Sequence, residues 1–391
     1  MVEFLSVIWD YIIPFLVVLT VLVFVHEMGH YLAARKCGIR VEVFSVGFGR
    51  ELFGWTDEAG TRWKLSAIPF GGYVKMFGEM QIPEDTAPDN KNTDDAAASE
   101  SVNGIPAVEP TAFSSKSLGQ RAFVVFAGPL ANFLFAIAIL AGMFMTVGQP
   151  FTPSDIGVVI PNSAAERAGF QAGDIIMGID GTRVERFEQV IRKVQLHPDE
   201  KLNFQVRRGD REINLTAIPE ILYQKDRFGN QQRIGRLGIS RAGTDMKLIQ
   251  HGPFTAVWRA ATETYVLTGS IFSALGQIIR GTRSTKELGG PIRIAEMSGN
   301  VWQAGLISVL MFATILSINL GLINLFPIPM LDGGHLLFYA IEALRGRPLG
   351  PRAQEYGLRI GIAMVLSLMV FATWNDLVQL RVVDFFVDLV T

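Results

Sequence analysis

The sequence has little cysteine and little charge. Its one cysteine, Cys37, excludes an internal disulfide framework and a cysteine-rich metal site. Only 18% of the residues are charged and the formal net charge is −2, which argues against nucleic acid as a partner. No Lys or Arg precedes Arg35, so the N-terminus lacks the basic region of a cleavable signal peptide. The compartment must therefore be inferred from topology.

The sequence is rich in apolar residues. The 391 residues are 49% hydrophobic, and their mean hydropathy is +0.30. A chain this apolar is unlike an average soluble enzyme, and it is long enough for a membrane part plus a small soluble domain. A membrane crossing needs about 20 apolar residues. Four segments meet that need, at about residues 11–34, 121–147, 304–325 and 355–375.

The flanks of these segments predict the orientation. Residues 1–10 carry only acidic charges, whereas the short loop between the last two segments carries Arg345, Arg347 and Arg352. Short basic loops stay on the inner side of a membrane. We therefore expect both termini and residues 148–303 outside, and residues 35–120 and the 345–352 loop inside.

The inner loop between the first two segments has two parts. Residues 40–76 look like a β-hairpin that turns at "TDEAG", with Gly47, Gly49, Gly71 and Gly72 marking bends or close backbone approach. Residues 81–111 are acidic, rich in Pro, Ala and Ser, and nearly devoid of large apolar side chains, which predicts a disordered linker.

The outer region reads as a compact β-rich domain over residues 155–220. "IGVVI" and "GDIIMGIDG" predict short strands, "RFEQVIRKVQL" a helix, and "KLNFQVRRGDREINLTAI" a hairpin that turns at Gly209. Residues 221–247 look like a connection with one more strand near Leu237. A fifth apolar stretch, 254–280, is interrupted by Arg259 and Glu263, and we expect an amphipathic helix lying on the membrane.

The first apolar segment contains H-E-x-x-H, formed by His26, Glu27 and His30. Positions i and i+4 share one face of a helix, so both imidazoles can bind one Zn²⁺ with the glutamate beside them as a general base. Two histidines satisfied by ordinary hydrogen bonds are the alternative. Ionisable groups inside a membrane cost about 2.5–3.5 kcal/mol each, so their placement here favours a metal site.

Such a site needs a third protein ligand and an open position for water. Asp332, in "INLFPIPMLDGGHLLF", follows the third apolar segment and is the first candidate, with His335 as its competitor. An aspartate before a helical run could equally be a helix N-cap. Pro327 and Pro329 exclude a regular helix before it, and such backbone is tolerated at membrane depth only inside protein or along a cavity.

Three motifs together resemble the site-2 protease family of intramembrane zinc metalloproteases. They are "HEMGH" in the first segment, "FAGPLANF" in the second and "NLFPIPMLDGG" after the third. The bacterial regulator-of-sigma-E type, here with one PDZ domain, is the most similar. The resemblance implies Zn²⁺ held by His26, His30 and Asp332, with Glu27 as the catalytic base.

The resemblance also implies a substrate site. Asn324 and Pro327 of the N-x-x-P-x-P motif, and Gly47, Gly49, Gly71 and Gly72 of a membrane-associated hairpin, would contact the substrate. A transmembrane substrate must unwind before its backbone can be cut, and pairing with a strand edge would satisfy its freed polar groups. A plain hairpin and a polar bond between helices are the alternatives. For Gly128 and Pro129 of "AGPLAN" we favour close helix packing and a kink.

The sequence of the PDZ-like domain departs from the usual PDZ pattern. The usual carboxylate-binding Gly-Leu-Gly-Phe loop is missing, and "PSDIGVVI" (153–160) stands near its place. We therefore favour a gate that excludes substrates with bulky outer domains over capture of peptide C-termini.

The sequence thus predicts a polytopic α-helical membrane protein with four transmembrane helices, an inserted β-rich PDZ-like domain and a membrane-associated β-hairpin. We expect a multi-pass monomer of the bacterial inner membrane that cuts single-span membrane proteins, such as an anti-sigma factor or remnant signal peptides, after a first cleavage. The alternatives are a PDZ-bearing scaffold with a non-catalytic metal site and a membrane zinc hydrolase that acts on lipid or another small molecule. The expected parts are 1–36 (first helix with HExxH), 37–80 (hairpin), 81–112 (linker), 113–148 (second helix), 150–222 (PDZ-like domain), 223–303 (connecting strand and surface helix), 304–345 (third helix with the aspartate motif) and 346–391 (fourth helix and tail).

Overall fold

The computed structural model describes residues 8–79, 109–151, 153–225, 231–241, 247–281 and 289–379. The predicted linker, 81–112, lies mostly outside the described residues. The chain forms two compact units. The first comprises Met1–Ala136 and Ala295–Leu368, and the second comprises Ile137–Ile294 and Met369–Thr391. Each unit is considered by itself below.

Four helices of the described residues are long and apolar enough to cross a membrane, as the sequence predicts. The amphipathic stretch 254–280 is not among them. The first helix begins with a short π-helical turn and ends where Gly38 adopts a left-handed φ of 67°, a usual helix stop. The four are α2 (Ile13–Lys36, after η1, Ile8–Ile12), α3 (Leu118–Thr146), α8 (Leu306–Asn324) and α10 (Pro351–Gln379).

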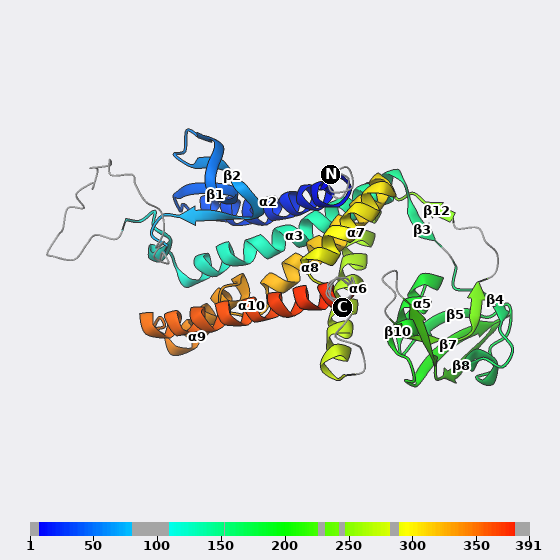
Figure 1. Ribbon diagram of the computed structural model, residues 1–391. Helices are drawn as coiled ribbons and strands as arrows, with labels where there is room; N and C mark the ends of the chain where they lie inside the picture. Colours follow the sequence, from blue (N-terminus) through cyan, green and yellow to red (C-terminus); the bar gives the residue numbers. More distant parts are fainter. Residues whose placement is uncertain are drawn as a thin grey trace, which may run out of the picture. The chain divides into compact units, whose positions relative to one another are not determined.

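In the first unit, a long antiparallel hairpin lies against α2 (Figure 1). Its strands are β1 (Val41–Thr56) and β2 (Arg62–Met76). In the turn between them, the Asp57 carboxylate accepts hydrogen bonds from the backbone N–H groups of Ala59 and Thr61. The hairpin folds back on itself, so that Phe44 near the start of β1 pairs with Trp63 just after the turn and stacks on it at 4.4 Å between ring centroids. Several large apolar residues on the far half are exposed: Phe48, Leu52, Phe53, Trp55, Leu65 and Ile68.

The third apolar helix does not continue to residue 345. α8 stops at Asn324, an irregular stretch follows, and a separate helix, α9 (Asp332–Arg345), begins at the aspartate. The two prolines of that stretch explain the break, because proline cannot donate a helical backbone hydrogen bond. Two further helical pieces are η2 (Phe113–Ser115) and α7 (Pro291–Gln303).

In the second unit, the β-rich domain contains the strands, the helix and the hairpin turn at Gly209 that the sequence predicts. Its core consists of buried residues from both helices and the sheet, among them Ile176, Phe204 and Val190. A four-stranded sheet has the order β6-β5-β7-β8, and β4 pairs with β11 (Ile239–Arg241). The elements are β4 (Ile156–Val159), α4 (Ala164–Arg167), β5 (Ile175–Ile179), β6 (Thr182–Arg183), α5 (Phe187–Leu196), β7 (Leu202–Arg208) and β8 (Arg211–Ala217).

The prediction of one strand in 221–247 was wrong. That region contributes a hairpin and two short strands, one of which, β12, pairs with β3 (Gln149–Phe151). These strands are three to six residues long, and "EILYQK" and "QQRIGR" carry polar residues on both faces, so no apolar alternation marks them. They are β9 (Glu220–Lys225), β10 (Gln231–Arg236), β11 (Ile239–Arg241) and β12 (Lys247–Ile249).

The two charges that interrupt the amphipathic stretch have partners in the β-rich domain. The stretch forms α6 (Pro253–Ile279), on which Glu263 accepts hydrogen bonds from Arg186 at 2.5 Å and Arg192 at 3.0 Å. Arg259 pairs with Glu185 at 2.8 Å. Both charges therefore bind α5 and the loop before it, within the second unit.

A buried ion pair predicts how the β-rich domain responds to acid. The Asp174 carboxylate is fully buried and accepts two hydrogen bonds from Arg208, at 2.7 and 2.8 Å. Burial raises the pKa of Asp174, but the bonds from Arg208 and the Gln171 N–H outweigh it and hold the pKa below its usual value. The resulting stabilisation is complete above the unfolded pKa of about 3.9 and is lost as pH falls through the lower folded pKa.

We expect the domain to lose stability below about pH 4, and Asp174→Asn to remove this part of the pH dependence. At neutral pH, Arg208→Met should cost about 2–3 kcal/mol, because it leaves a buried carboxylate without its partner. Exposed Arg211→Met is the matched control. Hydrogen exchange of β7 and β8 in the full-length protein, corrected for intrinsic rates, measures both effects. An unchanged pH profile in Asp174→Asn would contradict the assignment.

Candidate metal centre

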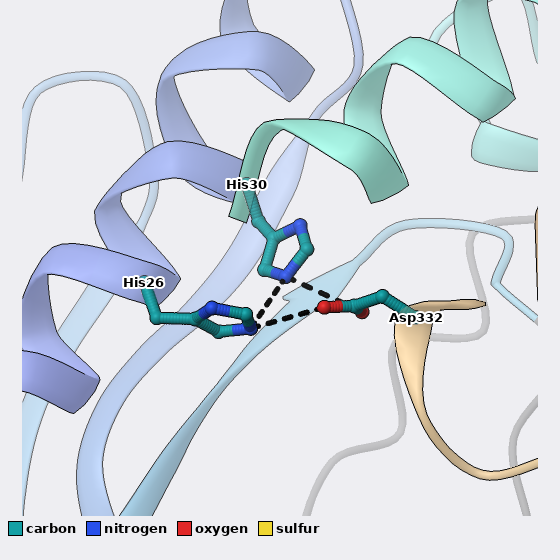
Figure 2. A group of neighbouring side chains, drawn as sticks. All are labelled: His26, His30 and Asp332. Carbon is teal, nitrogen blue, oxygen red and sulfur yellow. Dashed lines mark hydrogen bonds and ion pairs between the residues drawn. The ribbon is translucent and has the colours of Figure 1, made fainter. Parts of the chain in front are cut away.

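The H-E-x-x-H motif lies within α2, so its two histidines project from one helical face (Figure 2). His26 and His30 are both buried, and their Nε2 atoms are 3.2 Å apart. Glu27 is half-buried and lines the same cavity. The helical spacing therefore produces the arrangement that the sequence predicts.

Asp332 completes the group from the start of α9. Its Oδ2 lies 3.1 Å from the Nε2 of His26, and its Oδ1 lies 3.5 Å from the Nε2 of His30. The N-cap alternative is not observed, because Leu331 occupies the cap position and Asp332 is the first helical residue. There the helix dipole still favours its negative charge. His335 lines the cavity but does not belong to the group of donor atoms.

The irregular backbone before Asp332 packs so closely against the start of α9 that the two positions after the aspartate have no room for side chains. A Cβ on Gly333 would lie 2.2 Å from the carbonyl oxygen of Phe326, and one on Gly334 would lie 2.4 Å from that of Ile328. Met330 adopts a φ of 99°, which is uncommon outside glycine and is often found at functional sites. The two glycines thus let the irregular stretch fold tightly against α9 and fix the aspartate.

The three side chains fit a zinc ion. A tetrahedral Zn²⁺ with ligand bonds of about 2.0–2.1 Å separates its ligand atoms by about 3.3 Å. The three distances here are 3.1, 3.2 and 3.5 Å. The Oδ2 of Asp332 is buried without a hydrogen bond, which would be costly in a site without a cation. Two imidazoles and a carboxylate also match the donor set of catalytic zinc sites.

Neighbours on α3 orient both imidazoles. The Nδ1 of His30 donates to the Val124 carbonyl at 2.9 Å, which leaves its Nε2 lone pair for a metal. The Nδ1 of His26 lies 3.1 Å from the side-chain amide of Asn132, which is fully buried. Metal binding through Nε2 requires a proton on Nδ1, so we expect the amide oxygen of Asn132 to face His26 and accept it.

The second sequence motif makes room for the histidines, which agrees with the packing interpretation. A Cβ on Gly128 would lie 2.3 Å from the Nε2 of His30, and a Cβ on Gly29 of α2 would lie 2.3 Å from the Ala127 carbonyl oxygen. The motif also supplies Asn132, which the sequence analysis did not identify. The available signal was that Asn132 is the one amide in the apolar part of α3 that follows Arg121.

Asn132→Leu is expected to lower zinc affinity by about 10- to 100-fold, because His26 loses the group that fixes its orientation and tautomer. Asn132→Asp keeps an acceptor oxygen and should retain most of the affinity. Zinc titration against a competing chelator measures both variants. Equal affinities for Asn132→Leu and wild type would show that the amide does not orient the ligand.

A cavity of about 430 Å³ opens beside the metal group. Of the predicted substrate residues, Asn324, Gly71 and Gly72 line it, and Asn324 Nδ2 lies 3.4 Å from the Nε2 of His26. Pro327, Gly47 and Gly49 do not line it. Gly47 instead bends β1, with a φ of 90° and the Ile68 carbonyl oxygen 2.8 Å from where a Cβ would be. Phe48, Tyr73 and Glu79 also line the cavity and were not predicted.

The β-rich domain has a groove of its own, of about 240 Å³. One wall is α5, with Phe187, Val190 and Val194, and the other runs from Gly235 to Ile239. From the sequence, the stretch 153–160 stands near the position expected for a carboxylate-binding loop. That stretch contains β4, whereas the glycine-containing loop beside the groove, "GRLGI", comes about 80 residues later in the chain.

Comparison with known proteins supports the chemistry of this centre. The model of peptidase family M50 matches residues 14–368. A protein of Agrobacterium fabrum named as a zinc metalloprotease is 45% identical over 95% of this chain and 96% of its own. A similarly named protein of Rhizobium meliloti is 45% identical over 94% and 96%. The metalloprotease MmpA of Caulobacter vibrioides is 35% identical over 97% and 98%.

A solved structure resembles part of the chain. The PDZ domain of the SdrC-like protein from Listeria monocytogenes is 17% identical and covers 24% of this chain and 90% of its own, with a TM-score of 0.18. The sequence relatives and the family match extend over nearly the whole chain, and they confirm the resemblance to site-2 proteases. The chain belongs to peptidase family M50.

Proposed function

We propose that this protein is a zinc-dependent endopeptidase that hydrolyses peptide bonds within the transmembrane segments of single-span membrane proteins. The observation that carries the proposal is the tetrahedral spacing of the donor atoms of His26, His30 and Asp332. Glu27 stands beside them in a cavity that also has a strand edge as a wall. No other described group of His, Cys, Asp or Glu offers three donor atoms so close together.

Each of these residues would have a separate role in peptide hydrolysis. A zinc ion held by His26, His30 and Asp332 would lower the pKa of its water to about 7 and polarise the substrate carbonyl. Glu27 would take the proton of the attacking water and pass it to the leaving amine as the C–N bond breaks. Asn324, whose amide lies 3.4 Å from the Nε2 of His26, would donate a hydrogen bond to the substrate carbonyl.

The hairpin would hold the substrate. A helical substrate has no free backbone to attack, and unwinding it in a membrane leaves N–H and C=O groups without partners. Within the described residues, residues 72–75 of β2 pair only with residues 43–46 of β1, so the other edge of this part of β2 is unpaired. Gly71 to Val74 of β2 line the cavity next to Glu27. An unwound segment added along this edge would gain backbone hydrogen bonds at the metal site.

The membrane placement follows from the apolar surfaces. The four apolar helices would cross the bilayer, and the exposed Phe53 and Trp55 suit a hairpin that dips into it. The basic loop after α9 would lie inside, and both termini and the β-rich domain outside. We propose the bacterial inner membrane as the location. The PDZ-like domain would then act as an outer gate, and a first cleavage would precede this one.

The proposal is tested with the full-length protein in lipid vesicles and a single-span reporter. We expect cleavage inside the membrane segment that stops on adding a chelator and returns with Zn²⁺. Bound zinc without cleavage of any single-span reporter would favour the scaffold. Hydrolysis of lipid without cleavage of any reporter would favour the lipid hydrolase. Either outcome would reject the proposal.

A further inference from the structure

A second cavity adjoins the metal site and has no role in the chemistry above. Its volume is about 530 Å³, and it shares three lining residues with the first cavity: Glu79, His335 and Tyr339. Its other walls come from the segment around Phe113, from α9 and from the loop before α10, including Pro348 and Leu349. Both cavities lie within the first unit. Space therefore continues from the metal ligands toward the α9–α10 loop.

The charges of this second cavity are not balanced. Arg121 and Glu342 neutralise each other, with Nη2 and Oε1 2.6 Å apart, and the guanidinium lies over the ring of Tyr339. Both side chains are mostly buried. Glu79 is exposed and accepts only a long hydrogen bond, 3.4 Å, from the Met76 N–H. No described residue forms an ion pair with Glu79, so it is the unpaired carboxylate between the two cavities.

The position of the cavity matches the inner end of a substrate. In the proposed topology the α9–α10 loop is on the inner side of the membrane. Single-span proteins carry an excess of Lys and Arg just beyond the inner end of their apolar segment. A substrate segment leaving the metal site by this route brings those residues to Glu79. The aromatic rings of Phe113, Phe338 and Tyr339 suit the long apolar stem of a basic side chain.

We propose that the second cavity is a subsite for the inner flank of the substrate, in which Glu79 pairs with a Lys or Arg. The inference rests on the proposed function and makes Glu79 a specificity-determining residue of that reaction. The arginines at and beside the α9–α10 loop do not oppose it, because Arg345, Arg347 and Arg352 do not line the cavity. Their exposed side chains suit anionic lipid headgroups at the inner surface.

The experiment compares three single-span reporters that differ only at one inner-flank position, which is Lys, Gln or Glu. Wild type, Glu79→Gln and the charge reversal Glu79→Lys are assayed as full-length zinc-loaded proteins in neutral vesicles. Glu58→Gln, an exposed carboxylate in the hairpin turn, is the matched control. The readouts are kcat/KM for each reporter and the zinc content, which reports folding of the site.

We expect wild type and Glu58→Gln to prefer the Lys reporter over the Gln reporter by about tenfold, as a charged hydrogen bond would produce. Glu79→Gln should show no preference, and Glu79→Lys should prefer the Glu reporter. A general loss of structure would lower all three rates and could not reverse their order. A Lys preference that survives both substitutions, or a wild-type preference for Gln or Glu, would overturn the subsite. Zinc-loaded wild type that cleaves none of the reporters would overturn the proposed function itself.

Discussion

Glu27→Gln is expected to abolish peptide hydrolysis while zinc remains bound. The substitution keeps the size of the side chain and its place beside Gly72, but an amide cannot take a proton from the attacking water. General base catalysis contributes about 10²- to 10⁴-fold, so the turnover number should fall by at least that lower factor. The three proposed ligands are unchanged, so the metal content should stay at the wild-type value. Reporter cleavage and metal analysis on the same purified sample measure both.

Two outcomes would contradict this role of Glu27. Wild-type turnover in Glu27→Gln, with chelator-sensitive cleavage, would place the base elsewhere in the cavity. Loss of zinc together with activity would mean that Glu27 supports the metal rather than the proton transfer. The control is Glu58→Gln, which removes an exposed carboxylate from the tip of the adjacent hairpin and should leave both quantities unchanged.

Asp332→Ala is expected to remove both the metal and the activity. The carboxylate is the only anionic donor in the group, and without it the two imidazoles are the only proposed ligands left. Loss of an orienting neighbour already costs zinc sites about 10- to 100-fold in affinity, so loss of a direct ligand should cost more. Zinc content after dialysis and reporter cleavage at saturating zinc measure the two effects.

His335→Gln is the matched control for the ligand assignment. His335 was the competing candidate, lies three residues along the same helix, and lines the same cavity. We expect this variant to retain zinc and a substantial part of the activity. If His335→Gln lost zinc and Asp332→Ala kept it, the ligand set would be wrong, whatever the effect of either variant on cleavage.

The sequence by itself determined the local parts of this protein. H-E-x-x-H fixes the relation of His26 to His30, because residues four apart meet on any helix. The length of the apolar runs determined the four long helices. Asp57 and Gly60 determined the position of the hairpin turn. Each of these features depends on interactions within a few residues, so one stretch of sequence contains all the information needed.

Contacts between distant segments were decided only by the tertiary structure. The residue pattern alone left Asp332, His335 and a helix cap as alternatives, and Asp332 was preferred only through the family resemblance. The tertiary structure brings the carboxylate of Asp332 to 3.1 Å from His26, although the two residues are about 300 positions apart in the chain. The same holds for Asn132 behind His26, for the space at Gly128, and for Glu79 between the two cavities. Chemical type and spacing say what a side chain can do. Which partners it meets is set by the packing of helices far apart in sequence, and no local pattern records that packing.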